Sequence, residues 1–482
     1  MVMIKKQDEF LDMYEKEVVQ HPKWEGLELY HQKRPEGEGG LSRRSFLKYG
    51  LAVAGIGAIG SVITMEPVPY KRGTAWAESK IPAEYWEIAS RYGPPQGKFG
   101  VPGGPATITV GYQPYCLQCM TANINKMARL WEKYLPKGSQ VKWFRSLSGP
   151  LINNNMLAGK NQFGYMCDTP GLRNLDTVPA KGGCTGGYDP GEHGAVVVRK
   201  DLYDAGKIRT VKDLDGKKIG VPFGSFSHRQ AYDVVHQFKV RPKLLDQSTE
   251  LQVTHMRAKN IDACITWEPY PSYLEYLGSG VRLLTGLEMD CTCISYRPQN
   301  AYHFWTTSDI TLMVVDWLRD RPDIMVAYLK AEEEARDMWA NNLELSAYYV
   351  WTDIPEFPQP VIRMVMEMNT PDGRFIHAPT APDGKRGLAD HQKGIAMQWR
   401  EAGYLTTEKS KDPEKFVDNE IDDRFYRLAL KELEAEGRWT SNRLAGFPVP
   451  IRADMWKRRH NLKNYMDVKL KPREWKPTKV KL

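Results

Sequence analysis

The 482-residue sequence lacks the short motifs that identify several large classes of enzyme. It has no HExxH zinc motif, no phosphate-binding Walker loop, no CxxCH haem motif, and no glycine-rich dinucleotide motif between a strand and a helix. No Ser, His and Asp residues stand in the order typical of a hydrolytic triad. The favoured interpretation therefore contains no catalytic residue, no metal ligand and no cofactor.

Long basic and long apolar runs are absent as well. The net charge of +8 is modest and spread along the chain, and no basic run with interleaved aromatic residues predicts a nucleic-acid surface. The longest weakly apolar stretch, 50–65, has 16 residues, whereas a membrane-spanning helix needs about 20. With 41% apolar and 26% charged residues, the composition is that of a globular protein of two or more domains.

The start of the chain has the pattern of an export signal. Residues 42–48 (SRRSFLK) resemble a twin-arginine motif, the apolar stretch 50–65 follows, and Ala75–Ala77 has the small-x-small pattern of a cleavage site. We interpret 1–77 as a signal region with a long polar leader, which places the protein in the periplasm or another extracytoplasmic compartment. The alternatives are a retained signal that anchors the protein to the membrane, or a buried helix after a chance arginine pair.

Strand and helix patterns alternate along the rest of the chain, which predicts an α/β fold with mostly parallel sheets. The predicted strands are 107–110, 141–144, 162–166, 195–199, 218–221 and 261–266, and the predicted helices are 121–134, 151–158, 310–350, 389–402 and 422–436. Two segments rich in Pro and Gly are predicted to have irregular structure. Residues 80–105 are expected to form an arm, and residues 346–385 a loop that wraps around the protein.

Five stretches occur in the order found in one family. They are 108–113 (ITVGYQ), 141–159 (VKWFRSLSGPLINNNMLAG), 168–170 (DTP), 211–227 (VKDLDGKKIGVPFGSFS) and 261–270 (IDACITWEPY). Together they resemble the nitrate/sulfonate/taurine solute-binding proteins of ABC importers, the NMT1/THI5-like group. The resemblance covers about half of the chain, and it implies a type II periplasmic-binding-protein fold with two α/β lobes, joined by hinge strands, around a ligand cleft.

That fold divides the chain as follows. Lobe I comprises 106–199 and 286–345, lobe II comprises 200–285, 78–105 is a linker or arm, and 346–482 is a helical C-terminal extension with a basic tail.

The ligand site is predicted where strands end and helices begin, because backbone N–H groups at helix N-termini stabilise anions. The resemblance places Gln113, Ser148, Asp168, Thr169, Ser225, Ser227, Trp267 and Glu268 along the cleft. Their surroundings add Cys116, Gly149 and His228. For Ser225 and Ser227, an equal alternative is that the side chain caps its helix. For Trp267 the alternative is a position in the core, and for Glu268 a structural role is slightly favoured over ligand binding. His228 is expected to be exposed or to face the ligand, since it lies on a polar turn.

The cysteines depart from the family, whose members mostly have few or none. Seven are present, at positions 116, 119, 167, 184, 264, 291 and 293. Disulfides are favoured for an exported chain, and a bridge between Cys116 and Cys119 is preferred. Clustered thiolates also suit a soft metal. Buried thiols acting as small apolar residues are the third interpretation, with Cys264 as the best example.

The function predicted is capture of a small anionic molecule for import, with an ABC-type membrane permease as the partner and no nucleic acid. The alternatives are a thiolate–metal protein or an enzyme on the same fold, and a receptor subunit docked on a membrane complex. The basic end of the chain, 452–482, is interpreted mainly as an arm packed across a lobe. Its alternative is contact with anionic lipid headgroups, to which each basic residue near the surface adds about 1 kcal/mol.

The export route is testable in living cells. Replacing Arg43 and Arg44 together with Lys should leave the precursor in the cytoplasm, because the pair is the recognised part of the signal. Fractionation followed by immunoblotting measures this. Normal export of the double variant would exclude the twin-arginine route.

Overall fold

The computed structural model describes residues 81–116, 119–189, 194–285, 307–368, 388–440 and 466–480. The predicted signal region and Cys291 and Cys293 lie outside these ranges. None of the helices within them is both long and apolar enough to span a lipid bilayer.

The first of two sheets has the strand order β2-β1-β3-β10-β4. Its strands are β1 (Thr107–Tyr112), β2 (Gln140–Arg145), β3 (Phe163–Cys167), β4 (Ala180–Asp189) and β10 (Thr307–Val314). β1 runs parallel to β2 and to β3, while β10 runs antiparallel to both of its neighbours. Helices α4 (Met120–Ala128), α5 (Gly149–Leu157) and α6 (Asp168–Thr177) follow the parallel strands.

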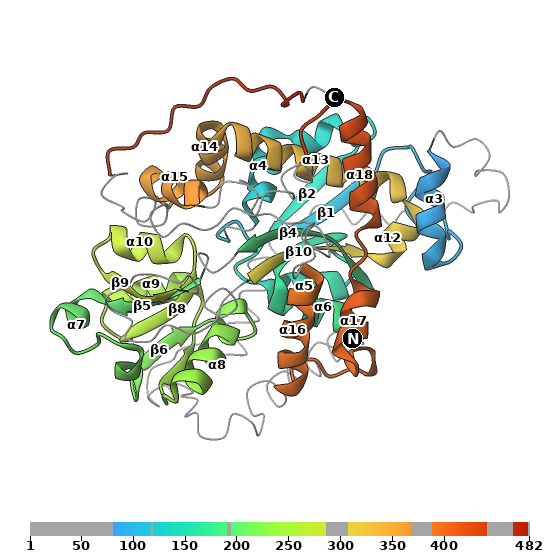
Figure 1. Cartoon of the computed structure of the whole chain (residues 1–482). Coiled ribbons are helices and arrows are strands. Elements are labelled where there is room, and N and C mark those ends of the chain that lie inside the picture. Colours follow the sequence, from blue (N-terminus) through green and yellow to red (C-terminus); the bar gives the residue numbers. More distant parts are fainter. Residues whose placement is uncertain are drawn as a thin grey trace, which may run out of the picture. The chain divides into compact units, whose positions relative to one another are not determined.

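The second sheet repeats this arrangement with the order β7-β6-β8-β5-β9. Its strands are β5 (Gly194–Arg199), β6 (Lys218–Val221), β7 (Lys243–Asp246), β8 (Ala263–Trp267) and β9 (Gly280–Thr285). Here β5 is the strand that runs antiparallel to both neighbours. Helices α7 (Lys200–Asp204), α8 (Phe226–Phe238), α9 (Thr249–Arg257) and α10 (Tyr270–Tyr276) belong to this sheet (Figure 1).

The prediction of two α/β lobes is confirmed, but that of mostly parallel sheets is only half correct. In each sheet two of the four strand pairings are antiparallel. The antiparallel strands β5 and β10 are the ones that directly follow the chain's passages between the sheets. β5 also corrects the predicted boundary of lobe I, because residues 194–199 pair within the second sheet.

Two further predictions were wrong. The helix expected over 310–350 begins only after β10 and is divided into α12 (Val315–Asp320), α13 (Pro322–Asn341) and α14 (Leu343–Asp353). The short apolar run 310–314 fits a strand and a helix equally well, so its period could not decide. The loop expected over 346–385 instead contains the end of α14 and helix α15 (Gln359–Met368), which starts beside Pro360 and buries Val361, Ile362 and Val365.

The arm 80–105 also contains regular structure, with helix α3 (Ala83–Ala89) and a short 3-10 turn. Two side chains between the end of α12 and the start of α13 hold this arm. Asp320 accepts the N–H groups of Gln96 (2.9 Å) and Lys98 (3.1 Å). Arg321, fully buried, donates to the carbonyls of Phe99 (2.8 Å) and Gly104 (2.6 Å).

The C-terminal extension is helical, as predicted. It contains α16 (Leu388–Glu401), α17 (Pro413–Glu420) and α18 (Arg424–Ala435), of which the sequence predicted the first and the last. α18 packs along α13, where Tyr426 donates to the buried carboxylate of Glu333 (2.6 Å) (Figure 1). α16 packs on α6 of the first sheet.

The tail was predicted to be an arm packed on the protein, and residues 466–480 confirm this. The Leu470 N–H donates to Gln359 Oε1 (2.9 Å), the Thr478 N–H donates to Asp337 Oδ2 (2.8 Å), and Trp475 joins the apolar cluster of α13, α14 and α15. The tail therefore binds through its backbone and its apolar side chains.

Asp353, the last residue of α14, joins the extension to the first sheet. Its carboxylate accepts from the Tyr112 hydroxyl (2.8 Å), the Asn123 amide (2.9 Å) and the Lys126 ammonium (2.5 Å), and the side chain is only 4% exposed. Three donors from β1 and α4 thus converge on one buried acceptor.

Replacing Asp353 with Ala should lower the free energy of unfolding by about 2–4 kcal/mol, because it leaves buried donors and a partly buried charge without a partner. Urea denaturation followed by circular dichroism measures the change. The matched control is Asp418→Ala, whose carboxylate is 55% exposed in a surface pair with Lys393 and should change stability by less than about 1 kcal/mol. Equal effects of the two substitutions would contradict the anchoring role.

Candidate functional site

An ion pair crosses from the first sheet to the second. Asp168 opens α6 directly after β3 and is fully buried, and its Oδ2 lies 3.4 Å from Arg229 Nη2 on α8. Its Oδ1 accepts from the N–H (2.5 Å) and the hydroxyl (3.0 Å) of Thr169. The structure thus brings two predicted residues, Asp168 and Thr169, to the contact between the lobes. Arg229 stands right after the predicted turn in the sequence, but only the fold identifies its partner.

The two serines of α8 do not cap the helix. Ser225 occupies the N-cap position, yet its hydroxyl donates to the Pro222 carbonyl (2.5 Å) and no N–H of the helix bonds to it. The Ser227 hydroxyl, fully buried, donates to Gln230 Oε1 (3.4 Å). The capping alternative is therefore wrong for both.

His228 was expected to be exposed or to face a ligand, and the first expectation is wrong. The side chain is 2% exposed and its ring stacks on Phe223, with ring centroids 4.4 Å apart. Its Nδ1 accepts the Gly224 N–H at 3.1 Å, and its Nε2 lies 3.5 Å from the Tyr404 hydroxyl. Burial lowers the pKa of His228 to about 3, so the ring is neutral at pH 7.

Helix α16 of the extension touches both lobes at this contact. Trp399 Nε1 donates to Thr169 Oγ1 (3.0 Å), and Gln398 Nε2 donates to Asp233 Oδ1 on α8 (2.8 Å). Burial raises the pKa of Asp233 to about 6, although Arg229 opposes the shift. Sequence reasoning missed Trp399 and Gln398 because the family resemblance ends near residue 345. An aromatic residue on the inward face of a predicted helix was the only available signal.

Two glutamines, one in each lobe, carry buried donors that are not used. Gln113 Nε2, just after β1, and Gln230 Nε2, on α8, have no hydrogen-bond partner within the part of the chain that the structure describes. Gln113 is 4% exposed and Gln230 is fully buried. An unpaired buried donor costs about 1–3 kcal/mol, so such groups point to an acceptor that is still to be supplied.

A short series of contacts connects the two glutamines across the lobes. A Cβ at Gly194, the first residue of β5, would come 2.1 Å from Gln230 Nε2, so the glycine allows the amide to lie on the strand. Gly194 pairs with Trp267 across β5 and β8. Trp267 Nε1 donates to the Tyr115 carbonyl (3.1 Å), two residues after Gln113. Trp267 therefore joins the two lobes through this hydrogen bond. Such a role is closer to the core position given as its alternative than to ligand binding.

The remaining predicted residues lie in other surroundings. Ser148 is half-buried before α5, where its carbonyl accepts from the Ser146 hydroxyl (2.8 Å). A Cβ at Gly149 would come 2.5 Å from the Pro170 ring, so this glycine allows α5 and α6 to pack closely. Glu268 is fully buried against Arg282 Nη2 (2.6 Å), which agrees with the structural role favoured for it.

No bridge joins Cys116 to Cys119, so the expected disulfide between them is wrong. Cys116 Sγ instead faces Cys167 Sγ at 3.7 Å, well beyond the bond length of about 2.05 Å in a disulfide. Cys264 lies within β8, and burial raises its pKa, as expected of a small apolar residue. Among the described residues, no three His, Cys, Asp or Glu side chains are placed to hold one metal ion.

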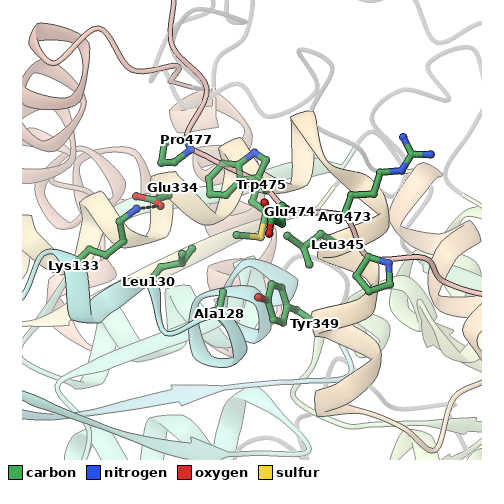
Figure 2. Close-up of a pocket in the computed structure, with 12 residues that line it drawn as sticks. Ala128, Leu130, Lys133, Glu334, Leu345, Tyr349, Arg473, Glu474, Trp475 and Pro477 are labelled. Atoms are coloured by element: carbon green, nitrogen blue, oxygen red, sulfur yellow. Dashed lines mark hydrogen bonds and ion pairs between the residues drawn. The ribbon is translucent and has the colours of Figure 1, made fainter.

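A separate cavity of about 460 Å³ lies beneath the tail (Figure 2). Leu130 and Tyr349 lie on one side of it, Trp475 of the tail lies on the other, and Met338 and Leu345 also line it. None of the predicted site residues lines it.

No protein-family model matches the chain, and no curated protein sequence matches it either. Solved structures do match the chain. The alkanesulfonate-binding protein SsuA of Xanthomonas axonopodis pv. citri is 17% identical, with a TM-score of 0.52 over 66% of this chain and 98% of that one. The aliphatic sulphonate-binding protein SsuA of Escherichia coli is 18% identical, with a TM-score of 0.51 over 67% and 100%. The nitrate-binding protein NrtA of Synechocystis PCC 6803 is 13% identical, with a TM-score of 0.53 over 76% and 98%. The chain has the fold of these periplasmic binding proteins, which confirms the predicted fold class.

The buried neutral ring of His228 predicts a pH dependence of stability. Because its pKa in the folded state, about 3, lies below the ordinary value of 6.5, the unfolded chain binds more protons between these limits. Stability is therefore lost as pH falls below 6.5. Relative to His228→Gln, wild type should lose about 2 kcal/mol between pH 7.5 and 5. Urea denaturation of both proteins across this range measures the difference. The raised pKa of Asp233 changes stability in the opposite direction, but this residue is present in both proteins, so its contribution cancels. Parallel stability curves would contradict a neutral buried His228.

Proposed function

We propose that the protein is an extracytoplasmic solute-binding protein that captures a small anion between its two sheets and passes it to a membrane import system. The observation that carries this proposal is the pair of unused amide donors, Gln113 Nε2 and Gln230 Nε2, one from each lobe. The fold shared with sulfonate- and nitrate-binding proteins supports the same class of ligand.

Neutral donors, more than net charge, favour an anion here. Arg229 is flanked by two carboxylates, Asp168 at 3.4 Å and Asp233 at 3.9 Å, so its positive charge is already balanced. Each of the two amides has an unused N–H donor, and the N-termini of α6 and α8 add the positive ends of two helices of 10 and 13 residues. An oxyanion such as a sulfonate or nitrate accepts such donors without carrying a proton of its own.

Capture would follow from closure of the lobes. The Arg229–Asp168 pair and the Trp267–Tyr115 hydrogen bond join the two sheets. A ligand that accepts from both Gln113 and Gln230 binds only when the lobes are together. Its binding therefore shifts the population towards closure, by no more than its difference in affinity for the two states.

Export and delivery complete the proposal. The twin-arginine signal and its cleavage after Ala77 would place the mature chain outside the cytoplasmic membrane. An ABC-type permease is the partner that would accept the ligand from the closed lobes. The basic tail, which the structure shows packed on α13 and α15 through residues 466–480, leaves Lys471, Arg473 and Lys476 exposed for a membrane or an acidic partner.

Gln113→Leu and Gln230→Leu should each weaken binding of the cognate anion by about 5- to 150-fold, which corresponds to about 1–3 kcal/mol. Gln113→Leu should keep its stability, because it removes a donor that has no partner in the described protein, whereas Gln230→Leu also removes the acceptor of the Ser227 hydroxyl and should lose about 1 kcal/mol. Titration calorimetry with nitrate and with short aliphatic sulfonates measures affinity, and urea denaturation measures stability.

The control is Gln252→Leu, a buried glutamine on α9 whose amide already donates to the Ile265 carbonyl (3.3 Å). It should lose stability and keep its affinity for the anion. If the substitutions at 113 and 230 left affinity for the anion unchanged, the proposed site would be wrong. Conversion of the bound compound into a product would favour an enzyme instead.

A further inference from the structure

The C-terminal tail forms an arch that is fixed at both ends. At one end the Leu470 N–H donates to Gln359 Oε1 (2.9 Å), and at the other the Thr478 N–H donates to Asp337 Oδ2 (2.8 Å). The segment between them, 472–477, begins and ends with proline, which restricts rotation of the backbone. The arch is therefore held in place by its ends and leaves the cavity of Figure 2 beneath its middle.

The space under the arch has the size of a small-molecule site. Its volume is about 460 Å³, and pockets for small ligands commonly measure about 300–1,000 Å³. Buried Leu130 and Met338 and half-buried Leu345 give it apolar walls, while Tyr349 and Trp475 lie on opposite sides of it (Figure 2). Two aromatic side chains placed in this way can contact one ligand together.

The charges around the cavity leave one carboxylate unbalanced. Lys133 pairs with Glu334, whose carboxylate is fully buried. The Arg473 guanidinium points away from the cavity (Figure 2). The exposed Glu474 carboxylate, which lines the cavity beside Trp475, has no ion pair and no hydrogen bond within the residues that the structure describes. The unpaired charge at the cavity is therefore negative.

This combination selects an organic cation. The face of an aromatic ring attracts a cation, Trp most strongly, and aromatic side chains are the usual means of recognising quaternary ammonium groups. A metal ion such as Ca²⁺ fits poorly, because it takes about six to eight oxygen ligands and the described lining offers one free carboxylate. An anion would be repelled by Glu474.

We propose that the cavity beneath the tail binds a small quaternary ammonium compound. Its cationic group lies between Trp475 and Tyr349 near the Glu474 carboxylate, and its alkyl groups contact Leu130 and Met338. None of the residues proposed for the anion lines this cavity, so the two sites are independent. The tail thus provides one wall of a second ligand site.

The test is titration calorimetry of the full-length protein with choline and with 3,3-dimethyl-1-butanol, a neutral molecule of nearly the same shape. Choline should bind with one equivalent. The neutral alcohol should bind at least about tenfold more weakly, because it lacks the charge that the aromatic faces and Glu474 recognise. Equal affinities for the two compounds, or no binding of choline, would overturn the proposal.

Two positions locate the site. Trp475→Leu should weaken choline binding by about 5- to 30-fold, whereas Trp475→Phe, which keeps an aromatic face, should lose less. Glu474→Gln should weaken binding and also remove its dependence on salt, since salt screens an exposed carboxylate. The matched control is Glu414→Gln, an exposed carboxylate on α17 that should change neither property. Unchanged choline affinity in Trp475→Leu would overturn the proposal.

A third measurement uses wild type alone and does not depend on how the variants fold. A crystal structure with tetramethylarsonium, a quaternary cation whose arsenic scatters anomalously, should show one peak within about 6 Å of the Trp475 ring centroid. A peak between the two sheets instead, or no peak in the cavity beneath the tail, would overturn the proposal.

Discussion

The buried ion pair between Asp168 and Arg229 is the contact on which the arrangement of the candidate site depends. A charge removed from water is tolerated only with a partner, so each residue restricts the position of the other's helix. Asp168 also fixes Thr169, which accepts from Trp399, and Arg229 lies near Asp233, which accepts from Gln398. One pair therefore links the first sheet, the second sheet and the C-terminal extension.

The extension gives this protein a feature beyond two lobes and a hinge. The similarity to the two SsuA structures covers 66% and 67% of this chain. Within the extension, α16 packs on α6 through apolar side chains, and Tyr232 of α8 packs on the same apolar cluster. Gln398 of α16 and Tyr404, which follows α16, add polar contacts with α8. α16 therefore contacts both lobes at once.

The sequence predicts most strands correctly because short β-branched runs between turn residues, such as 107–110 and 218–221, leave little choice. The sequence does not predict β10, because its apolar run continues directly into a helix and shows no alternation typical of a strand. The site is harder. Asp168, Thr169 and Ser227 follow from the family resemblance, but burial of His228 beneath Phe223 and Tyr404 depends on a helix more than 150 residues away. Likewise, Cys116 has Cys119 as its neighbour in sequence and Cys167 as its neighbour in space, because β1 and β3 are adjacent strands.

The central claim is that an anion completes the hydrogen bonding of Gln113 and Gln230 between the lobes. It is tested most directly by a crystal structure of the protein with 2-bromoethanesulfonate, in which anomalous scattering locates the bromine independently of the refined coordinates. The account predicts one strong peak between the two sheets, with the sulfonate oxygens within about 3.2 Å of both amide nitrogens. A peak in the cavity beneath Trp475 instead, or two amides that bond to protein groups while the anion lies elsewhere, would contradict it.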